Sequence, residues 1–205
     1  IYMNTYFWEF KSIMIASFLG IYAMSTFTAF LLIPRLVLFL EKRSILLFSI
    51  ALAALIPPIP IILYINNILP DSGSWNLFFA LSPFIYIGNT CLSSSAIVRE
   101  SMLGDISDEV ELESEIGQQG LMFASSSLIG KLNTGLGILV AGLALEFIGF
   151  PRGSEILPNA DQIFSLAMVQ GPFVAALMIV PFGIFFLYNI DRQKHNAILS
   201  QLDAR

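Results

Sequence analysis

Charged residues, cysteine and histidine are all scarce in this chain of 205 residues. Only 12% of the residues are charged, well below the roughly 25% of a soluble globular domain, while 56% are hydrophobic. A large water-soluble core is therefore excluded. The single cysteine, Cys91, has no second thiol in the chain, so an intrachain disulfide is excluded as well.

The sequence also lacks the residue patterns that are typical of enzyme active sites. No cluster of ligating side chains has metal-site spacing, no G-x-S-x-G is present, and Cys91 lies far along the chain from the single histidine, His195. We therefore predict that the protein is not an enzyme and has no catalytic residue, metal site or resident cofactor. The net charge of −5 comes mainly from one acidic stretch, and nothing in the sequence indicates nucleic-acid binding.

Long hydrophobic runs dominate the sequence, and the mean hydropathy is +0.78. Lipid offers backbone groups no hydrogen-bond partner, and no alternating barrel pattern is visible, so we predict an all-α integral membrane protein. Pro57, Pro58 and Pro60 predict a kink in the second run, which shapes packing or acts as a hinge. The five predicted spans are residues 12–34, 44–66, 76–98, 119–148 and 163–190.

The basic residues predict the orientation, because Lys and Arg gather on the cytoplasmic side of a membrane protein. Only Lys11 and Arg152 fall on the opposite side from the other loop cations. We therefore expect an outside N-terminus, a cytoplasmic connector at residues 99–118 and a cytoplasmic tail at 191–205. The chain starts at Ile1 without a signal peptide, so we also expect it to be a fragment. The cytoplasmic set is Arg35, Lys42, Arg43, Arg99, Arg192, Lys194 and Arg205.

A polar face follows the third span. Ser82, Tyr86, Asn89 and Ser93 recur at i, i+4, i+7 and i+11, which places them on one side of a helix. In lipid this face must turn inward. Two interpretations stay open: hydrogen bonding to a neighbouring helix, or lining of a solute cavity, for which Tyr86 and Asn89 are the better candidates.

Lys131 lies near the middle of the fourth span, ~18 Å along the helix from Gln119. A charge at that depth is costly and faces a protein interior. Lys131 either forms a structural ion pair with a carboxylate of another helix or has a functional role. None of the five spans carries an acid deep in its core that could be the partner in such a pair. Small and polar residues share its face, while Met122, Ile129, Leu136, Val140 and Leu143 form an opposite face predicted to meet lipid. The polar face comprises Gly120, Ala124, Ser127, Lys131, Thr134, Gly135 and Gly142.

Several segments resemble one transporter family. The stretch GDISDEVELESEIGQQGLMFASSSLIGKL and the Gly-rich run to ALEFIGFP resemble the signature around helix eleven of the glycoside–pentoside–hexuronide cation symporters. These are the melibiose-carrier branch of the major facilitator superfamily. NTYFWEF, the basic loop with Arg35 and Lys42, and the tail HNAILSQL are also similar to that family. The positions that match the signature are Asp105, Asp108, Glu111, Gly120, Lys131 and Gly149.

The resemblance implies that the five spans are helices eight to twelve of a twelve-helix transporter. Helix seven and the N-terminal half, which holds the main sites for the coupling cation, Na⁺ or H⁺, would lie outside this chain. The family carries a sugar or related small polar solute by rocking two halves about a central site, and Lys131 matches a lysine at that site. The chain departs from the pattern at Gln119, where the family has Glu, and in a third span without tryptophan.

We therefore predict a cation-coupled symporter of the cell membrane. A non-transporting membrane scaffold or solute sensor is the alternative, and it would tolerate a neutral residue at position 131. The predicted partners are a small polar solute, the coupling cation, the lipid bilayer and the remaining half of the same polypeptide. The predicted solute contacts are Lys131, Tyr86, Asn89, Ser127 and Thr134, and the predicted cytoplasmic gate is Asp105, Asp108 and Glu111.

Overall fold

The computed structural model describes residues 2–151, 157–185, 198 and 200, and these residues form helices without any strand. Five helical segments are long and apolar enough to cross a membrane: Ser12–Phe39, Lys42–Ile65, Trp75–Ser114, Gln119–Phe147 and Ala160–Leu177. The elements are η1 (Met3–Phe7), α1 (Ser12–Phe39), α2 (Lys42–Leu55), α3 (Pro58–Ile65), α4 (Trp75–Ser114), α5 (Gln119–Phe147), α6 (Ala160–Met168), η2 (Val169–Phe173), α7 (Val174–Leu177) and α8 (Ile179–Ile184). The all-helical membrane fold is thus confirmed, while the predicted tail at 191–205 lies almost wholly outside the described residues.

The structure adds detail to three of the predicted segments. The second span is broken into α2 and α3, because Pro57 and Pro58 cannot donate the backbone hydrogen bonds that would continue α2. Most of the predicted connector at residues 99–118 is helical and continues α4, which runs unbroken to Ser114 and ends where Glu115 adopts a left-handed φ of 59°. The last span is interrupted by the π-turn η2, which contains Gly171 and Pro172.

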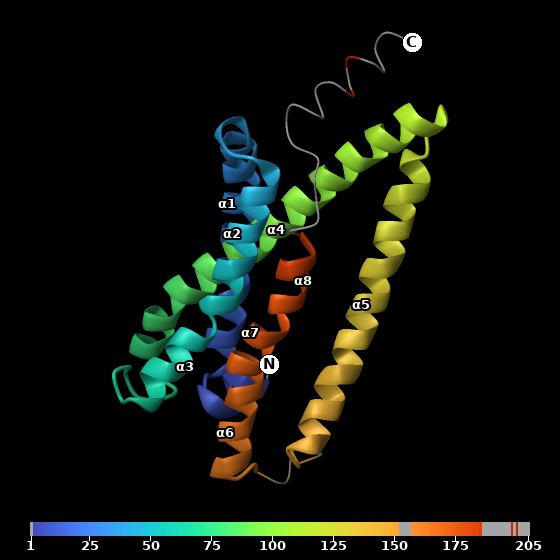
Figure 1. Cartoon of the computed structure of the whole chain (residues 1–205). Helices are drawn as coiled ribbons and strands as arrows, with labels where there is room; N and C mark the ends of the chain where they lie inside the picture. Colours follow the sequence, from blue (N-terminus) through green and yellow to red (C-terminus); the bar gives the residue numbers. More distant parts are fainter. Residues whose placement is uncertain (1, 152–156, 186–197, 199, 201–205) are drawn as a thin grey trace.

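Helix α4 is the centre of the fold, because it packs along both α1 and α2 (Figure 1). Its start is fixed by Ser74, whose hydroxyl accepts a hydrogen bond of 3.1 Å from the Leu77 backbone N–H. Two apolar clusters hold the helices. One surrounds Phe18, Leu77 and Phe78, and the other lies around Leu46 and Val98.

The end of the molecule that carries η1 is closed by aromatic side chains. The rings of Trp8 and Tyr64 have centroids 5.2 Å apart, and those of Tyr6 and Phe150 are 5.3 Å apart. Gln162 ties the same region to the end of α5 through a hydrogen bond from its side-chain amide to the Gly149 carbonyl. These contacts fasten the far end of α5 to η1 and α6.

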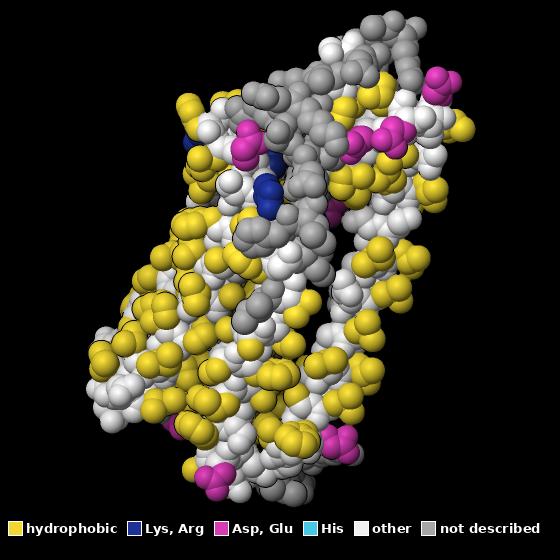
Figure 2. Space-filling view, in the orientation of Figure 1, with side chains coloured by type: hydrophobic (Ala, Val, Ile, Leu, Met, Phe, Trp, Pro, Cys, Tyr) yellow, Lys and Arg dark blue, Asp and Glu magenta, His cyan; other side chains and the backbone are white. Residues whose placement is uncertain are grey.

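Helix α5 differs from the other long helices, α1, α2 and α4, because none of its residues is buried. It leaves α4 at the turn of residues 115–118 and diverges from it (Figure 1). On the face shown in Figure 2, hydrophobic side chains cover the middle of the molecule and charges gather towards the two ends, while α5 stands apart along its middle. This distribution is that of a bundle crossing a bilayer.

Candidate functional site

The polar face predicted on the third span lies against α1. The Asn89 side-chain amide donates to the Ser25 hydroxyl at 2.5 Å, and contacts Thr26 Oγ1 and the Tyr22 carbonyl at 3.3 Å each. The Tyr86 hydroxyl lies 2.6 Å from Thr28 Oγ1. These bonds match the first interpretation left open by the sequence, hydrogen bonding between helices.

The row of hydrogen bonds between α1 and α4, here called the seam, continues along α4. Ser93 Oγ lies 3.1 Å from Thr26 Oγ1, and the Thr90 hydroxyl donates to the Ser25 carbonyl of α1 at 3.4 Å. Polar bonds between helices in lipid are worth about 0.6 kcal/mol on average. Several of them in one seam fix the register of α1 against α4. The contribution of Tyr86 and Asn89 to a solute site stays a prediction.

Lys131 lies on the exposed surface of α5, and so do Ser127 and Thr134. Among the residues that the structure describes, Lys131 makes no ion pair or side-chain hydrogen bond. The Thr134 hydroxyl donates to the Gly130 carbonyl of its own helix at 3.0 Å. The polar face of α5 is thus available to a partner outside the described chain.

The apolar face of α5 is the one that turns towards the rest of the bundle. Met122, Ile129 and Asn133 line a cavity of about 570 Å³ between α5 and the second half of α4. Val140 and Leu143 line a second cavity, of about 790 Å³, between α5 and α6. These side chains stay 50–57% exposed at Ile129, Val140 and Leu143, so their contact with lipid stays a prediction. Asn133, which did not fit the predicted faces, contributes to the inner wall.

This arrangement places Lys131 on the outer side of α5. Val140 follows Lys131 by nine residues, about two and a half turns, so the two side chains leave the helix in opposite directions. In Figure 1 the first half of α4, which carries Tyr86 and Asn89, lies far from α5. The described chain therefore does not bring the five predicted solute contacts together.

The three acids predicted to form a gate contact residues of this chain. Asp105 is buried and forms an ion pair with Lys42, whose Nζ lies 2.6 Å from Oδ1. Asp108 accepts a hydrogen bond of 3.3 Å from the Gln119 side chain. The Glu111 carboxylate lies against Gly117 in the turn between α4 and α5. Together they link α2, α4 and α5, and a gating role for them stays a prediction.

No sequence pattern indicates that Lys42, rather than a residue of another domain, pairs with Asp105. Sixty-three residues separate them, and only the packing of α2 on α4 brings them together. No group of three or more His, Cys, Asp or Glu side chains in the described part of the chain could hold a metal ion.

Comparison with known proteins agrees with these observations. The family model of the MFS/sugar transport proteins matches residues 1–192. A protein of Synechocystis sp. described as an uncharacterized symporter is 28% identical over 141 residues, which is 67% of this chain and 25% of that protein. The matched part thus spans about a quarter of that relative. No solved structure matches the chain. The family model matches nearly the whole length of this all-helical chain with its five candidate spans. The chain therefore belongs to the MFS/sugar transport protein family.

Proposed function

We propose that this chain is the C-terminal part of a cation-coupled symporter that carries a sugar or related small polar solute by alternating access. The five spans correspond in this proposal to helices eight to twelve of a twelve-helix transporter. The observation that carries the proposal is the position of Lys131, midway along a membrane-crossing helix and on the face that turns away from the bundle.

A lysine at the centre of a span costs at least about 2.5–3.5 kcal/mol if it faces lipid, so this face requires a polar environment. The acid of α5 itself, Glu146, follows Lys131 by fifteen residues, about 22 Å along the helix, which is too far for an ion pair. A carboxylate or a solute oxygen from outside the described chain would satisfy the ammonium. The second half of the transporter and the solute would supply these groups.

Hydroxyl groups near Lys131 suit a sugar. Ser127 lies about one turn before Lys131 and Thr134 about one turn after it, so one ammonium and two hydroxyls share the outer face of α5. Sugars present closely spaced hydroxyls that donate and accept. In this proposal Tyr86 and Asn89 reach the solute only if it replaces their hydrogen bonds to α1.

The coupling cation, Na⁺ or H⁺, binds mainly to the N-terminal half in this proposal. The end with Lys42 and Asp105 faces the cytoplasm, since most cations of the loops lie there. Asp105, Asp108 and Glu111 would then act in closing the cytoplasmic side. Cavities along α5 and the π-turn η2 in the last span are compatible with helices that move during alternating access.

Uptake by the full-length protein in proteoliposomes tests the proposal. We expect a Na⁺ or proton gradient to drive accumulation of at least one sugar from a panel of labelled mono- and disaccharides. Lys131→Leu should abolish this uptake and leave the melting temperature unchanged. Lys11→Leu, which removes an exposed lysine outside the spans, is the matched control and should transport normally.

The scaffold or sensor alternative gives a different result. A sugar would then raise the melting temperature of the protein without any gradient-driven accumulation. Normal uptake by Lys131→Leu would contradict the proposed role of Lys131, even in a protein that transports.

A further inference from the structure

The second and the last membrane-crossing spans are both interrupted, and the two interruptions lie against each other. Pro57 and Pro58 separate α2 from α3, and the π-turn η2, which contains Pro172, separates α6 from α7. Because proline has no backbone N–H, the carbonyl groups of residues 53, 54 and 168 lack their usual α-helical donors. Helices bend at prolines and at π-turns, so each of these spans has a place where it can bend.

The contact between the two interruptions is close. Gly171 of η2 is buried, and a Cβ atom there would lie 2.8 Å from Ile61 Cδ1 and 3.7 Å from Pro58 Cα. Both of those residues belong to α3. The last span is thus held to the second span at its own point of bending. This contact can serve as a pivot for the part of the last span that follows it.

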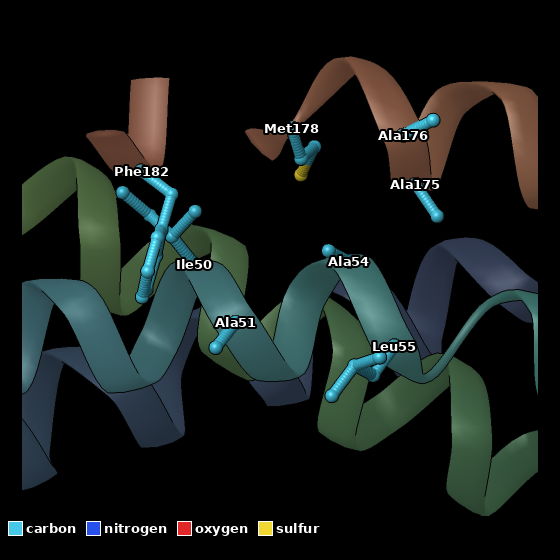
Figure 3. Close-up of a pocket in the computed structure, with 8 residues that line it drawn as sticks. All are labelled: Ile50, Ala51, Ala54, Leu55, Ala175, Ala176, Met178 and Phe182. Carbon is cyan, nitrogen blue, oxygen red and sulfur yellow. The ribbon is translucent and has the colours of Figure 1, made fainter. Parts of the chain in front are cut away.

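Beyond the pivot, the two spans separate around an apolar slot of about 350 Å³, which lies between α2 and the α7–α8 segment (Figure 3). In Figure 3, Ala54 of α2 and Ala175 of α7 point into the space between their helices, and Phe182 of α8 reaches over Ile50. The middle of the slot is therefore lined by short side chains. Half of the lining residues are alanines, namely Ala51, Ala54, Ala175 and Ala176.

The two walls of the slot differ in how firmly they are held. Helix α2 is fixed to α4 where Leu46 packs in one cluster with Val98. The first residue of α2, Lys42, also forms the ion pair with Asp105 of α4. By contrast, none of the residues of α7 is buried, and α8 reaches the cluster through Phe182. The α7–α8 segment is therefore the wall that can move.

Closure of the slot is physically favourable. All of its lining side chains are apolar, so they offer no partners to water, which needs two to four hydrogen bonds in a cavity. Walls that face an unfilled space forfeit the dispersion contacts that atoms across the gap would supply. Alanine side chains let two helix backbones approach closely in a membrane, so contact between the walls would restore those interactions.

We propose that the slot is the open state of a hinge in the last span. The α7–α8 segment rotates about the contact of Gly171 with α3, and η2 bends, until Ala175 meets Ala54 and the slot is closed. The prolines of the second span place the pivot, and η2 supplies the bend. This inference rests on the transport function proposed above, because it assigns the open and closed slots to different steps of alternating access.

Disulfide trapping in the full-length protein tests the closure. Cysteines replace Ala54 and Ala175 in a version with serine at Cys91 and at every cysteine outside these 205 residues. A disulfide requires Cβ atoms about 3.5–4.5 Å apart, and therefore contact between the two walls. We expect the oxidant copper phenanthroline to link Ala54→Cys to Ala175→Cys, which mass spectrometry of the digested protein would detect. Gradient-driven sugar uptake should then fall several-fold and return when a reductant breaks the bond.

A control pair uses the same position on α7. Phe48 is 66% exposed on another face of α2, so Phe48→Cys/Ala175→Cys should stay unlinked and should transport normally with the oxidant present. Absence of the disulfide between positions 54 and 175 would overturn the closure, whether or not the protein transports. A disulfide that leaves uptake unchanged would overturn the place of closure in the transport cycle. If the reduced protein accumulates no sugar, the proposed function fails, and the disulfide alone still decides whether the slot closes.

A change at the π-turn tests where the hinge lies. Pro172→Ala restores a backbone N–H for the carbonyl of residue 168 and lets an α-helix continue through η2. We expect the disulfide between positions 54 and 175 to form several-fold more slowly in this variant, without a drop in melting temperature. Formation at the unchanged rate would overturn η2 as the hinge.

Discussion

Lys42 at the start of α2 and Asp105 in the second half of α4 form a bidentate ion pair, with Nζ 2.6 Å from Oδ1 and 2.8 Å from Oδ2. The side chains are 23% and 8% exposed. The pair joins two residues that are 63 positions apart in the sequence. It lies at the end of the molecule where α4 continues beyond the apolar part of its span. This pair connects two spans of the described chain, whatever further contacts form during transport.

Asp105→Asn should destabilise the protein, because it leaves the partly buried Lys42 without its counter-charge. Breaking a buried pair costs roughly 3–5 kcal/mol, and the 23% exposure of Lys42 places our expectation at the lower end. The melting temperature of the full-length protein in detergent measures the effect. Glu100→Gln removes the exposed pair with Arg99 and should change the melting temperature little.

The opposite pattern would identify a gate in place of a structural pair. In that case Asp105→Asn would alter the rate of uptake while the melting temperature stayed at the wild-type value. The double variant Lys42→Met/Asp105→Leu provides a further check. It removes both charges together and should recover much of the stability lost in Asp105→Asn.

Asn89→Ala should weaken the contact between α1 and α4. It removes the bond to Ser25 and the longer contacts to Thr26 and the Tyr22 carbonyl, so we expect a loss of about 1–2 kcal/mol. Ser95→Ala is the control, since the Ser95 hydroxyl donates to the Leu92 carbonyl of its own helix. A raised KM for solute with an unchanged melting temperature would instead show that Asn89 is a solute ligand.

Gly171→Ala should destabilise the last span by about 1–3 kcal/mol, because its Cβ would overlap Ile61 Cδ1. Ile61→Val removes that methyl group and should restore part of the loss when the two changes are combined. Gly20→Ala is the matched control: nothing lies within 4 Å of a Cβ at that helical position. It should be neutral or slightly stabilising. Equal melting temperatures for Gly171→Ala and Gly20→Ala would refute the tight contact.

Hydropathy was sufficient to predict the membrane-crossing segments, because bilayer thickness fixes the length of an apolar run. The kink at Pro57 and Pro58 was also predictable from backbone chemistry. The length of α4 was not, since a hydropathy boundary after Val98 says nothing about where a helix ends. Leu103, Ile106 and Val110 have helical spacing, and the helix simply continues through them to Ser114.

The orientation of α5 shows why site residues are harder to predict. Helical periodicity separates a polar face of α5 from an apolar one, but it does not say which face turns towards the rest of the bundle. Met122 and Ile129 face α4 across a cavity, and Lys131 turns outward. Likewise, nothing in the sequence indicates that Asn89 and Tyr86 contact Ser25, Thr26 and Thr28 of α1. Only the packing of α1 on α4 makes those pairs.

The most direct test of our account asks what surrounds position 131. In a version of the full-length protein in which Cys91 and every cysteine outside these 205 residues is replaced by serine, a cysteine is introduced at Lys131 or, as the buried control, at Ala29, which is 0% exposed in α1. We predict that a water-soluble, membrane-impermeant thiol reagent modifies Lys131→Cys, that transported sugar slows this reaction, and that Ala29→Cys does not react. Failure of Lys131→Cys to react with this reagent, with labelling only by a lipid-soluble one, would contradict a solute-facing Lys131.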